Sequence, residues 1–311
     1  MTLSQDGNPN QSAELTAKIH CPACRALCRA ASVEIPDHEY GLVQLARYAE
    51  CEACGTLFQV PMPGVSELAA YYPPDYHSMT HAGFLNRVRN ELRVHRLSKL
   101  VHGNGPVLDF GCGDGAFLVQ ASERMRDRQF WGFEIAERET IEHLRNGSVK
   151  IVKGDLRDLL RILPRCSAIT MNHVIEHLPE PSATMSALAE RLEPGGILEG
   201  QTPAADSLER TVFGRKWSGY HAPRHTVIFS KCGLHSMLRD CGLTSISTDA
   251  AFNPAGIAVS LGSLGHRNGG RIKRAGSKWL ALMAAAAVLA PIDLLSGRPG
   301  IMNFAAYRNP E

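Results

Sequence analysis

The sequence lacks several features that would place it in a specialised class of protein. Its 33 Lys and Arg residues nearly balance its 31 Asp and Glu residues, which argues against a strongly electrostatic nucleic-acid binder. Residues 1–17 are polar and lack an apolar stretch, so we expect a disordered tail, no secretory signal and a cytoplasmic protein. We find no internal repeat or low-complexity tract. The 311 residues are enough for one large and one small domain.

The chain also lacks an apolar run long enough to span a bilayer. The most apolar segment, residues 276–290, has the pattern of an alanine-rich helix, and Pro291 and Asp293 are expected to prevent its extension. We interpret this segment as a core or dimer helix before the last strand. Peripheral contact of the segment with the inner face of a membrane is the alternative. The sequence does not determine the oligomeric state.

Strand and helix patterns alternate from residue 106 onward. The strands are expected at 106–110, 130–134, 149–152, 168–172, 196–201 and 301–307, and the helices at 115–125, 137–144, 156–163, 182–192 and 231–241. Such alternation indicates an α/β fold with a parallel sheet covered on both faces. We divide the chain into a tail (1–17), a cysteine-containing module (18–62), a linker or lid with a helix (63–104) and a main domain (105–311).

A basic helix is expected at residues 84–100, immediately before the main domain. Its predicted apolar stripe consists of Phe84, Leu85, Val88, Leu92 and Leu100. The Arg and Lys side chains between these positions are interpreted as a solvated face, with contact to phosphates as the alternative.

The segment VLDFGCGDGAFL is the strongest local signal in the main domain. An apolar strand ends near Asp109, and Gly111, Gly113 and Gly115 form the turn into a helix. Glycines permit positive φ and close approach of a ligand, and the helix N-terminus offers free N–H groups to an anion. By itself the turn also fits the G-x-G-x-x-A pattern of dinucleotide-binding folds, so the cofactor is ambiguous at this point.

Four further motifs follow in order. Glu134 ends the second strand and suits ribose hydroxyls, and Asp155 in GDL suits an adenine amino group. The motif NHVIEHL follows the fourth strand, and LEPGG precedes the fifth. Together, these motifs resemble the class I S-adenosylmethionine (SAM) dependent methyltransferase family over residues 106–201.

The resemblance implies a Rossmann-like, doubly wound sheet of seven strands whose last strand is antiparallel. It also implies that the turn and the strand ends contact SAM. The residues concerned are Asp109, Gly111, Cys112, Gly113, Glu134, Asp155, Leu156, Asn172 and His173.

Two C-x-x-C pairs lie in the N-terminal module. Cys21 and Cys24 form the first pair, Cys51 and Cys54 the second. Two such knuckles can complete a tetrahedral S₄ site, and a zinc ion with four thiolates is closed to substrate. We therefore predict a structural Zn²⁺ in a zinc-ribbon-like module, rather than a catalytic or redox site. The cysteine module, followed by a tyrosine-rich YYPPDY segment and the cofactor fold, is similar to sugar and glycan-pathway methyltransferases.

The acceptor side of the site is expected in two other segments. The first contains His177, and the second, GRKWSGYHAPRHTVIFS, follows the fifth strand. The candidate bases are His177, His221 and His225, because histidine titrates near neutrality. The candidate substrate contacts are Tyr72, Tyr76, Trp217, Tyr220 and Arg224, a mixture suited to a polar acceptor. Arg224 pairing with a carboxylate such as Glu176 is the structural alternative.

The sequence thus predicts methyl transfer to a small molecule such as a sugar, nucleotide sugar or lipid-linked glycan. An RNA or protein methyltransferase is the first alternative, but the cysteine module lacks a dense Lys/Arg surface. A non-catalytic SAM-binding protein is the second. The IEH motif also resembles ubiquinone-pathway O-methyltransferases, which leaves open a second divalent metal near Glu176 and His177.

Overall fold

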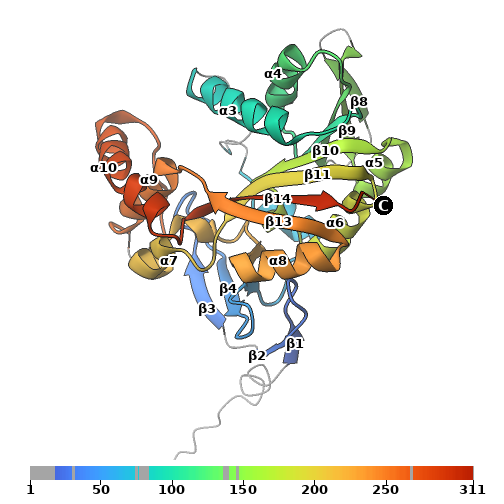
Figure 1. Cartoon of the computed structure of the whole chain (residues 1–311). Coiled ribbons are helices and arrows are strands. Elements are labelled where there is room, and N and C mark those ends of the chain that lie inside the picture. Colours follow the sequence, from blue (N-terminus) through green and yellow to red (C-terminus); the bar gives the residue numbers. More distant parts are fainter. Residues whose placement is uncertain are drawn as a thin grey trace, which may run out of the picture.

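A twisted sheet of eight strands forms the centre of the molecule (Figure 1). The computed structural model describes residues 18–29, 32–73, 76, 84–135, 140–144, 147–266 and 269–310; the predicted tail lies outside them. The strand order is β13-β14-β11-β10-β6-β7-β9-β8. The strands are β6 (Val107–Phe110), β7 (Phe130–Ile135), β8 (Thr140–Leu144), β9 (Val149–Gly154), β10 (Cys166–Asn172), β11 (Leu192–Pro203), β13 (Leu243–Ala250) and β14 (Ile301–Arg308).

The five inner strands β11, β10, β6, β7 and β9 are parallel. Their short apolar runs are buried on both faces, as expected for a parallel sheet covered by helices. One face is covered by α3 (Phe84–Leu100) and α4 (Ala116–Arg124), and the other by α5 (Leu156–Ile162), α6 (Pro181–Ala189) and α8 (Lys231–Asp240). The α/β architecture and the antiparallel last strand, β14, are confirmed.

The predicted count of seven strands is wrong, and the helix predicted at 137–144 is one reason. Its described part, Thr140–Leu144, is the edge strand β8, paired antiparallel with β9. Branching at Cβ of Thr140 and Ile141 disfavours a helix and suits a strand. Pairing with the free edge of β9 is a tertiary interaction that helical periodicity could not show.

Among the described side chains, the predicted apolar stripe of α3 is confirmed at Leu100, which packs against the core, and is wrong at Val88 and Leu92. Val88 and Leu92 are exposed, whereas Val94 and Leu97 are completely buried against the sheet. The helix is therefore rotated relative to the prediction. One consequence is that Arg93 is turned toward the carboxyl end of β6.

The N-terminal residues form two small sheets next to the main one. The hairpin of β1 (Lys18–His20) and β2 (Leu27–Arg29) forms a separate two-stranded sheet. A second sheet has the order β12-β5-β4-β3, from β3 (Ser32–Pro36), β4 (Leu45–Glu50), β5 (Leu57–Gln59) and β12 (Val227–Ile228). Since β12 belongs to the main domain, the two segments share a sheet. They also share a core, which contains Phe58 and Phe229.

The remaining helices lie on one side of the molecule (Figure 1). They are α7 (Leu208–Phe213), α9 (Pro254–Ser263) and α10 (Gly276–Leu295), while the short α2 (Val65–Ala70) follows β5. Contrary to expectation, α10 continues through Pro291 and reaches 20 residues. It is long and apolar enough to cross a membrane by length and composition, and 17% of its most apolar window is buried.

Candidate functional site

The glycine turn after β6 has the backbone geometry that the sequence predicts. Gly111, Gly113 and Gly115 have φ values of +78°, +56° and +76°, where L side chains are strained. A Cβ on Gly111 would lie 2.5 Å from a methyl carbon of Val174. The glycine therefore also allows the loop after β10 to pack directly on the turn.

Two buried carboxylates flank this turn. Glu134 Oε2 accepts from the backbone N–H of Gly113 at 2.7 Å. Asp109 Oδ1 accepts from the Thr170 hydroxyl at 2.6 Å and lies 3.4 Å from a guanidinium nitrogen of Arg93. Burial raises the pKa of both carboxyls. Carboxylates at these two strand ends are placed to bind an ammonium group and ribose hydroxyls.

Arg93 is a member of this site that the sequence did not single out. Its guanidinium lies 3.9 Å from the centroid of the Phe117 ring and beside Asp109. With its amide oxygen turned toward Arg93, Asn172 accepts from Nε at 3.2 Å and from Nη2 at 2.6 Å. A helical pattern places Arg93 among solvated basic residues, and only the rotation of α3 brings it to the turn.

The other predicted cofactor residues lie at the same edge of the sheet. Asp155 caps α5 by accepting from the Asp158 N–H at 3.0 Å, and Leu156 begins that helix. Cys112 is buried at the turn, where its Sγ lies 2.7 Å from the place of a Cβ on Gly132. His173, just after β10, has a positive φ of +56°. The residues predicted to contact SAM therefore lie at or just after the carboxyl ends of β6, β7, β9 and β10.

A second cluster, the aromatic–histidine cluster, lies beyond the loop after β10. It draws on four separated segments of the chain, and its members are Glu39, Tyr40, Tyr72, Tyr76, Glu176, His177, His221, Arg224 and His225. The ring centroids of His177 and His225 are 4.6 Å apart, and those of His221 and His225 are 5.0 Å apart.

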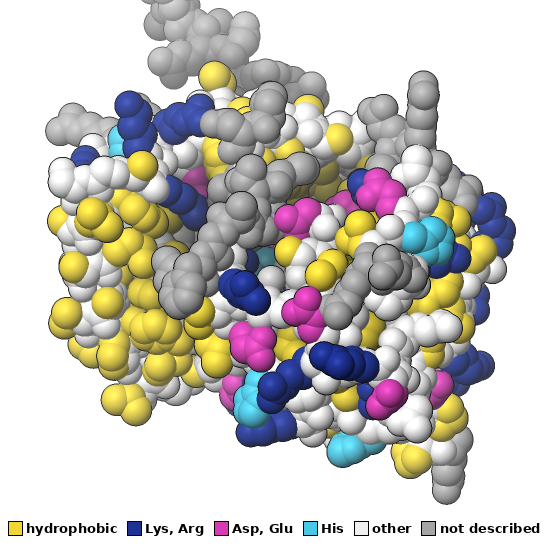
Figure 2. All heavy atoms as spheres, turned by 90° about the horizontal axis from the view of Figure 1, so that it is seen from above, with side chains coloured by type: hydrophobic (Ala, Val, Ile, Leu, Met, Phe, Trp, Pro, Cys, Tyr) yellow, Lys and Arg dark blue, Asp and Glu magenta, His cyan; other side chains and the backbone are white. Residues whose placement is uncertain are grey.

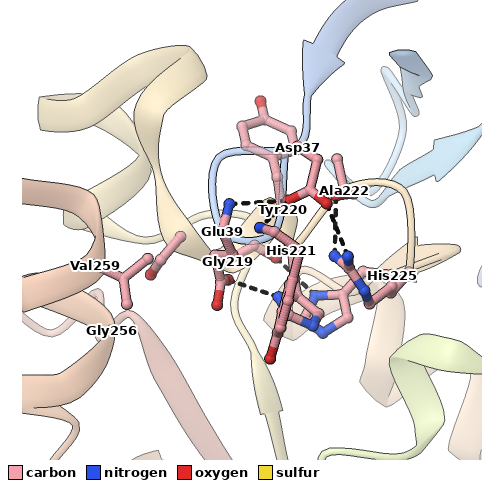
Figure 3. A network of polar contacts seen from close by, with 12 residues as sticks. Asp37, Glu39, Gly219, Tyr220, His221, Ala222, His225, Gly256 and Val259 are labelled. Carbon is pink, nitrogen blue, oxygen red and sulfur yellow. Dashed lines mark hydrogen bonds and ion pairs between the residues drawn. The ribbon is translucent and has the colours of Figure 1, made fainter. Parts of the chain in front are cut away.

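Three of these side chains form a hydrogen-bonded chain. His221 Nδ1 lies 2.6 Å from Glu39 Oε1 (Figure 3). His221 Nε2 lies 3.0 Å from the Tyr76 hydroxyl. A carboxylate only accepts, so Nδ1 carries the proton and Nε2 is left to accept from the phenol. This is the arrangement of an oriented general base. The positive φ of His221, +38°, shows that the surrounding structure holds it in an uncommon conformation.

The neighbouring pair of histidines has its protonation set in a similar way. His177 Nδ1 lies 3.1 Å from the Arg224 carbonyl oxygen, and His225 Nδ1 lies 2.8 Å from the Gly219 carbonyl oxygen. Burial lowers the pKa of His177 to about 4 and that of His225 well below its usual value, so both are neutral at physiological pH.

Glu176 lies between these histidines and is completely buried. Burial opposes its ionisation, but the hydrogen bond with His173 lowers the pKa of its carboxyl. Donor atoms of Glu176, His177 and His225 lie within 4.8 Å of one another. These three residues could therefore hold a divalent ion, which the sequence left open near Glu176 and His177.

Tyr72 is hydrogen-bonded within the cluster. Its hydroxyl lies 2.9 Å from His177 Nδ1, and burial raises its pKa. The cluster and the glycine turn are neighbours, because Val174, two residues before Glu176, packs on Gly111.

Three predicted substrate contacts are buried packing or structural residues in this structure. Trp217 and Tyr220 are 2% and 4% exposed and pack with Tyr48 in a core beside the small sheet. Arg224 is fully buried and donates to Asp37 Oδ2 at 2.8 Å. The alternative that Arg224 pairs with a carboxylate is therefore confirmed, but the carboxylate is that of Asp37 and not that of Glu176. Pairs of this kind fix the position of a loop, here that of residues 37–40.

The sequence missed Asp37 and Glu39. They follow β3 in the short polar string PDHEY, and Asp37 accepts from the backbone N–H groups of Glu39 and Tyr40 at 2.8 and 2.9 Å. Two acids in an otherwise ordinary loop are a weak signal. Their partners, Arg224 and His221, are more than 180 residues away in the chain.

The four cysteines of the two knuckles converge as predicted. The Sγ atoms of Cys21 and Cys54 are 3.7 Å apart, and those of Cys24 and Cys51 are 3.6 Å apart. A tetrahedral ion with Zn–S bonds of about 2.3 Å requires S···S edges of roughly 3.8 Å. The four thiols, which are distinct from nearby Cys28, are therefore compatible with zinc.

The chain shows clear similarity to one protein family. A family model described as a methyltransferase domain matches residues 84–248, more than half of the chain. Comparison with curated proteins finds no match.

Three solved structures illustrate the similarity found by structural comparison. A SAM-dependent methyltransferase from Archaeoglobus fulgidus is 16% identical, with a TM-score of 0.44, and the match covers 70% of this chain and 94% of that one. The [4+2]-cyclase SpnF is 17% identical, with a TM-score of 0.45 and coverages of 75% and 85%. A phosphoethanolamine N-methyltransferase from Haemonchus contortus is 14% identical, with a TM-score of 0.47 and coverages of 72% and 53%.

Proposed function

The chain belongs to the methyltransferase-domain family, and on this premise we propose that it methylates a small polar acceptor, namely a sugar, a nucleotide sugar or a lipid-linked glycan. The observation that carries the proposal is the hydrogen-bonded chain of Glu39, His221 and Tyr76. Such a chain suits the removal of a proton from a hydroxyl or an activated carbon acid. The Tyr and His side chains of the aromatic–histidine cluster suit a polar acceptor.

The glycine turn and its two carboxylates hold the donor in this proposal. Asp109 and Arg93 bind the ammonium and carboxylate ends of its amino acid, and Glu134 binds its ribose. SAM, when bound, supplies an electrophilic methyl group on a sulfonium. Alignment of the acceptor along the sulfur–methyl axis is then the main contribution of the protein, because the displacement is in line.

Proton transfer is the second contribution. The acceptor forms its new bond to the methyl carbon as the sulfur–methyl bond breaks, and the acceptor proton passes to Tyr76 and on to His221 Nε2. Glu39 stabilises the resulting imidazolium through Nδ1. General-base assistance of this kind is typically worth about 10²–10⁴-fold in rate.

The cysteine site has a structural role in this proposal. Four thiolates leave no open position on a zinc ion. The knuckle at Cys51–Cys54 forms the turn between β4 and β5, and β5 pairs with β12. Zinc therefore stabilises the small sheet that carries the loop of Asp37 and Glu39.

The experiment has two stages. Calorimetry with SAM tests donor binding by the purified protein. Labelled SAM is then offered with panels of sugar nucleotides, lipid-linked glycans, RNA and proteins. Label in a glycan class supports the proposal, and the Tyr76→Phe variant should abolish most of that transfer while SAM binding persists. Labelling of RNA or protein alone, or SAM binding without any transfer, would overturn it.

A further inference from the structure

Helix α10 presents a continuous apolar face to solvent. Leu280, Val288, Ile292 and Leu295 are 58–88% exposed. Their spacing places them on one side of the helix, while Ala286 and Ala290 pack on α9 from the other side. Figure 2 shows hydrophobic side chains gathered where α9 and α10 lie in Figure 1. A large exposed apolar patch marks an interaction surface.

The segment that carries this face is mainly basic. Residues 254–300 contain six Lys and Arg residues and one acid, whereas the rest of the chain has 27 basic and 30 acidic residues. The single acid, Asp293, is buried, and its carboxylate accepts from the Gly300 N–H at 3.0 Å. Lys273 and Lys278 are exposed at the N-terminal end of α10, and Arg298 is exposed beyond its C-terminal end.

This combination fits the surface of an anionic membrane. An apolar helix face lowers its free energy by burial at the boundary of headgroups and acyl chains, and basic residues at its ends contact anionic headgroups. Trp279 at the start of the helix is half-buried, and Trp is favoured at such interfaces. A water-soluble protein partner would not require cations at both ends of an apolar face.

Helix α10 cannot cross a bilayer while this fold is intact. The segment before it is held by the N–H groups of Gly270 and Ile272, which donate to the carbonyl oxygens of Asp37 and Glu39 at 3.0 Å. The segment after it enters β14, which pairs with β11 in the central sheet. Both ends of α10 are therefore attached to the same body, and a single crossing would separate them.

We propose that the exposed apolar face of α10 docks on an anionic lipid surface, with α10 lying in the plane of the interface. The segment that leads into this helix is hydrogen-bonded to the acceptor side of the site. Ile272 bonds to the backbone of Glu39, and the Glu39 side chain bonds to His221. If the proposed function holds, this arrangement delivers a membrane-anchored acceptor to the site.

Vesicle flotation tests the docking. The full-length protein is mixed with vesicles of phosphatidylcholine alone or with added phosphatidylglycerol. Binding should be about tenfold or more stronger to the anionic vesicles and should fall with salt. The double variant Val288→Glu/Ile292→Glu should lose most of it, and Lys273→Glu/Lys278→Glu should lose the preference for anionic lipid. Val43→Glu, at a site 93% exposed and outside this face, is the matched control and should bind as wild type.

Calorimetry with SAM separates docking from catalysis. Both double variants should keep wild-type SAM affinity and wild-type circular dichroism, because neither touches the glycine turn. Wild-type protein that ignores anionic vesicles would overturn the proposal, as would a Val288→Glu/Ile292→Glu variant that still floats. A dimer in light scattering that dissociates in this variant would instead assign the face to a second copy of the chain. Vesicle binding without any methyl transfer leaves the docking established and counts only against the proposed function.

Discussion

The two halves of the site are built in different ways. The donor half consists of strand ends that follow one another over residues 109–173, each within a short local motif. The acceptor half combines residues 37–40, Tyr72, Tyr76, residues 176–177 and residues 221–225, which meet only through long-range contacts. The parallel sheet assembles the first half by its topology, because carboxyl ends of adjacent parallel strands share an edge. The second half depends on buried ion pairs and on the small sheet.

This difference has a consequence for stability and specificity. The donor half is supported by the main core and should tolerate damage elsewhere. The acceptor half depends on Arg224 with Asp37, and on β5 pairing with β12. Substitutions that destabilise the small sheet should therefore impair turnover of the acceptor more than they impair SAM binding.

The largest expected effect comes from removing a zinc ligand. Cys51→Ser should lower zinc content to below one ion per chain and reduce the free energy of unfolding by roughly 3 kcal/mol or more. Urea denaturation and elemental analysis measure the two quantities. Cys28→Ser is the matched control, because Cys28 is buried beside the knuckles but is not one of the four ligands. Equal zinc content in both variants would contradict the assignment.

The acceptor half can be damaged without touching the donor half. Glu39→Gln and Tyr76→Phe should each lower kcat by about 10²-fold, because they remove the orientation of His221 and its proton-accepting partner. SAM affinity should stay within about twofold of wild type. Kinetics with the acceptor found by the labelling screen, together with calorimetry, measures the separation. A parallel loss of SAM binding would show that the two halves are not independent.

The donor half can be damaged in the reciprocal way. Glu134→Ala should weaken SAM binding about tenfold or more, because a charged acceptor for the ribose hydroxyls is lost. The variant should keep wild-type zinc content and melting temperature. Asp155→Ala is the comparison, since that side chain already caps α5 and bonds to Arg157. Unchanged SAM affinity in Glu134→Ala would refute the donor assignment.

A smaller effect concerns pH and the buried Glu199. Thr170 pairs in register with both Asp109 and Glu199. Burial raises the pKa of Glu199 to about 7 despite the nearby guanidinium groups of Arg93 and Arg96.

The folded state thus holds this proton more tightly than the unfolded chain does. The resulting stabilisation is present below about pH 4.5, the ordinary pKa of the group, and is lost as the pH rises through about 7. Glu199→Gln should remove this dependence and gain about 1–2 kcal/mol relative to wild type at pH 8. Urea denaturation at pH 5 and pH 8 tests this prediction. A difference in the free energy of unfolding between Glu199→Gln and wild type that is the same at both pH values would contradict it.

The smallest expected effect concerns the two knuckles themselves. Arg25 and Gly55 occupy the same place after their C-x-x-C pairs, with φ values of +61° and +78°. A side chain at positive φ is strained, so Arg25→Gly should stabilise the module by about 0.5 kcal/mol after the added entropy of the unfolded glycine. The exposed pair of Arg25 with Asp240 at 3.8 Å contributes little. Chemical denaturation measures the gain, and Gly55→Arg should have the opposite sign.

The sequence by itself determined the elements that depend on local pattern. The glycine turn, the acids at the strand ends, the cysteine knuckles and most of the alternating strands and helices all follow from short motifs and periodicity. These features are readable because backbone geometry and metal coordination require particular residues at fixed spacing.

Only the tertiary structure decided the rest. In the folded chain Arg93 lies beside Asp109, and residues 140–144 form an eighth strand. Trp217 and Arg224 are buried. Glu39 and His221 form a hydrogen bond although they are 182 residues apart, and α10 continues through Pro291. These outcomes depend on which surfaces meet when the sheet and its helices pack, and a linear pattern carries no information about partners so distant in the chain.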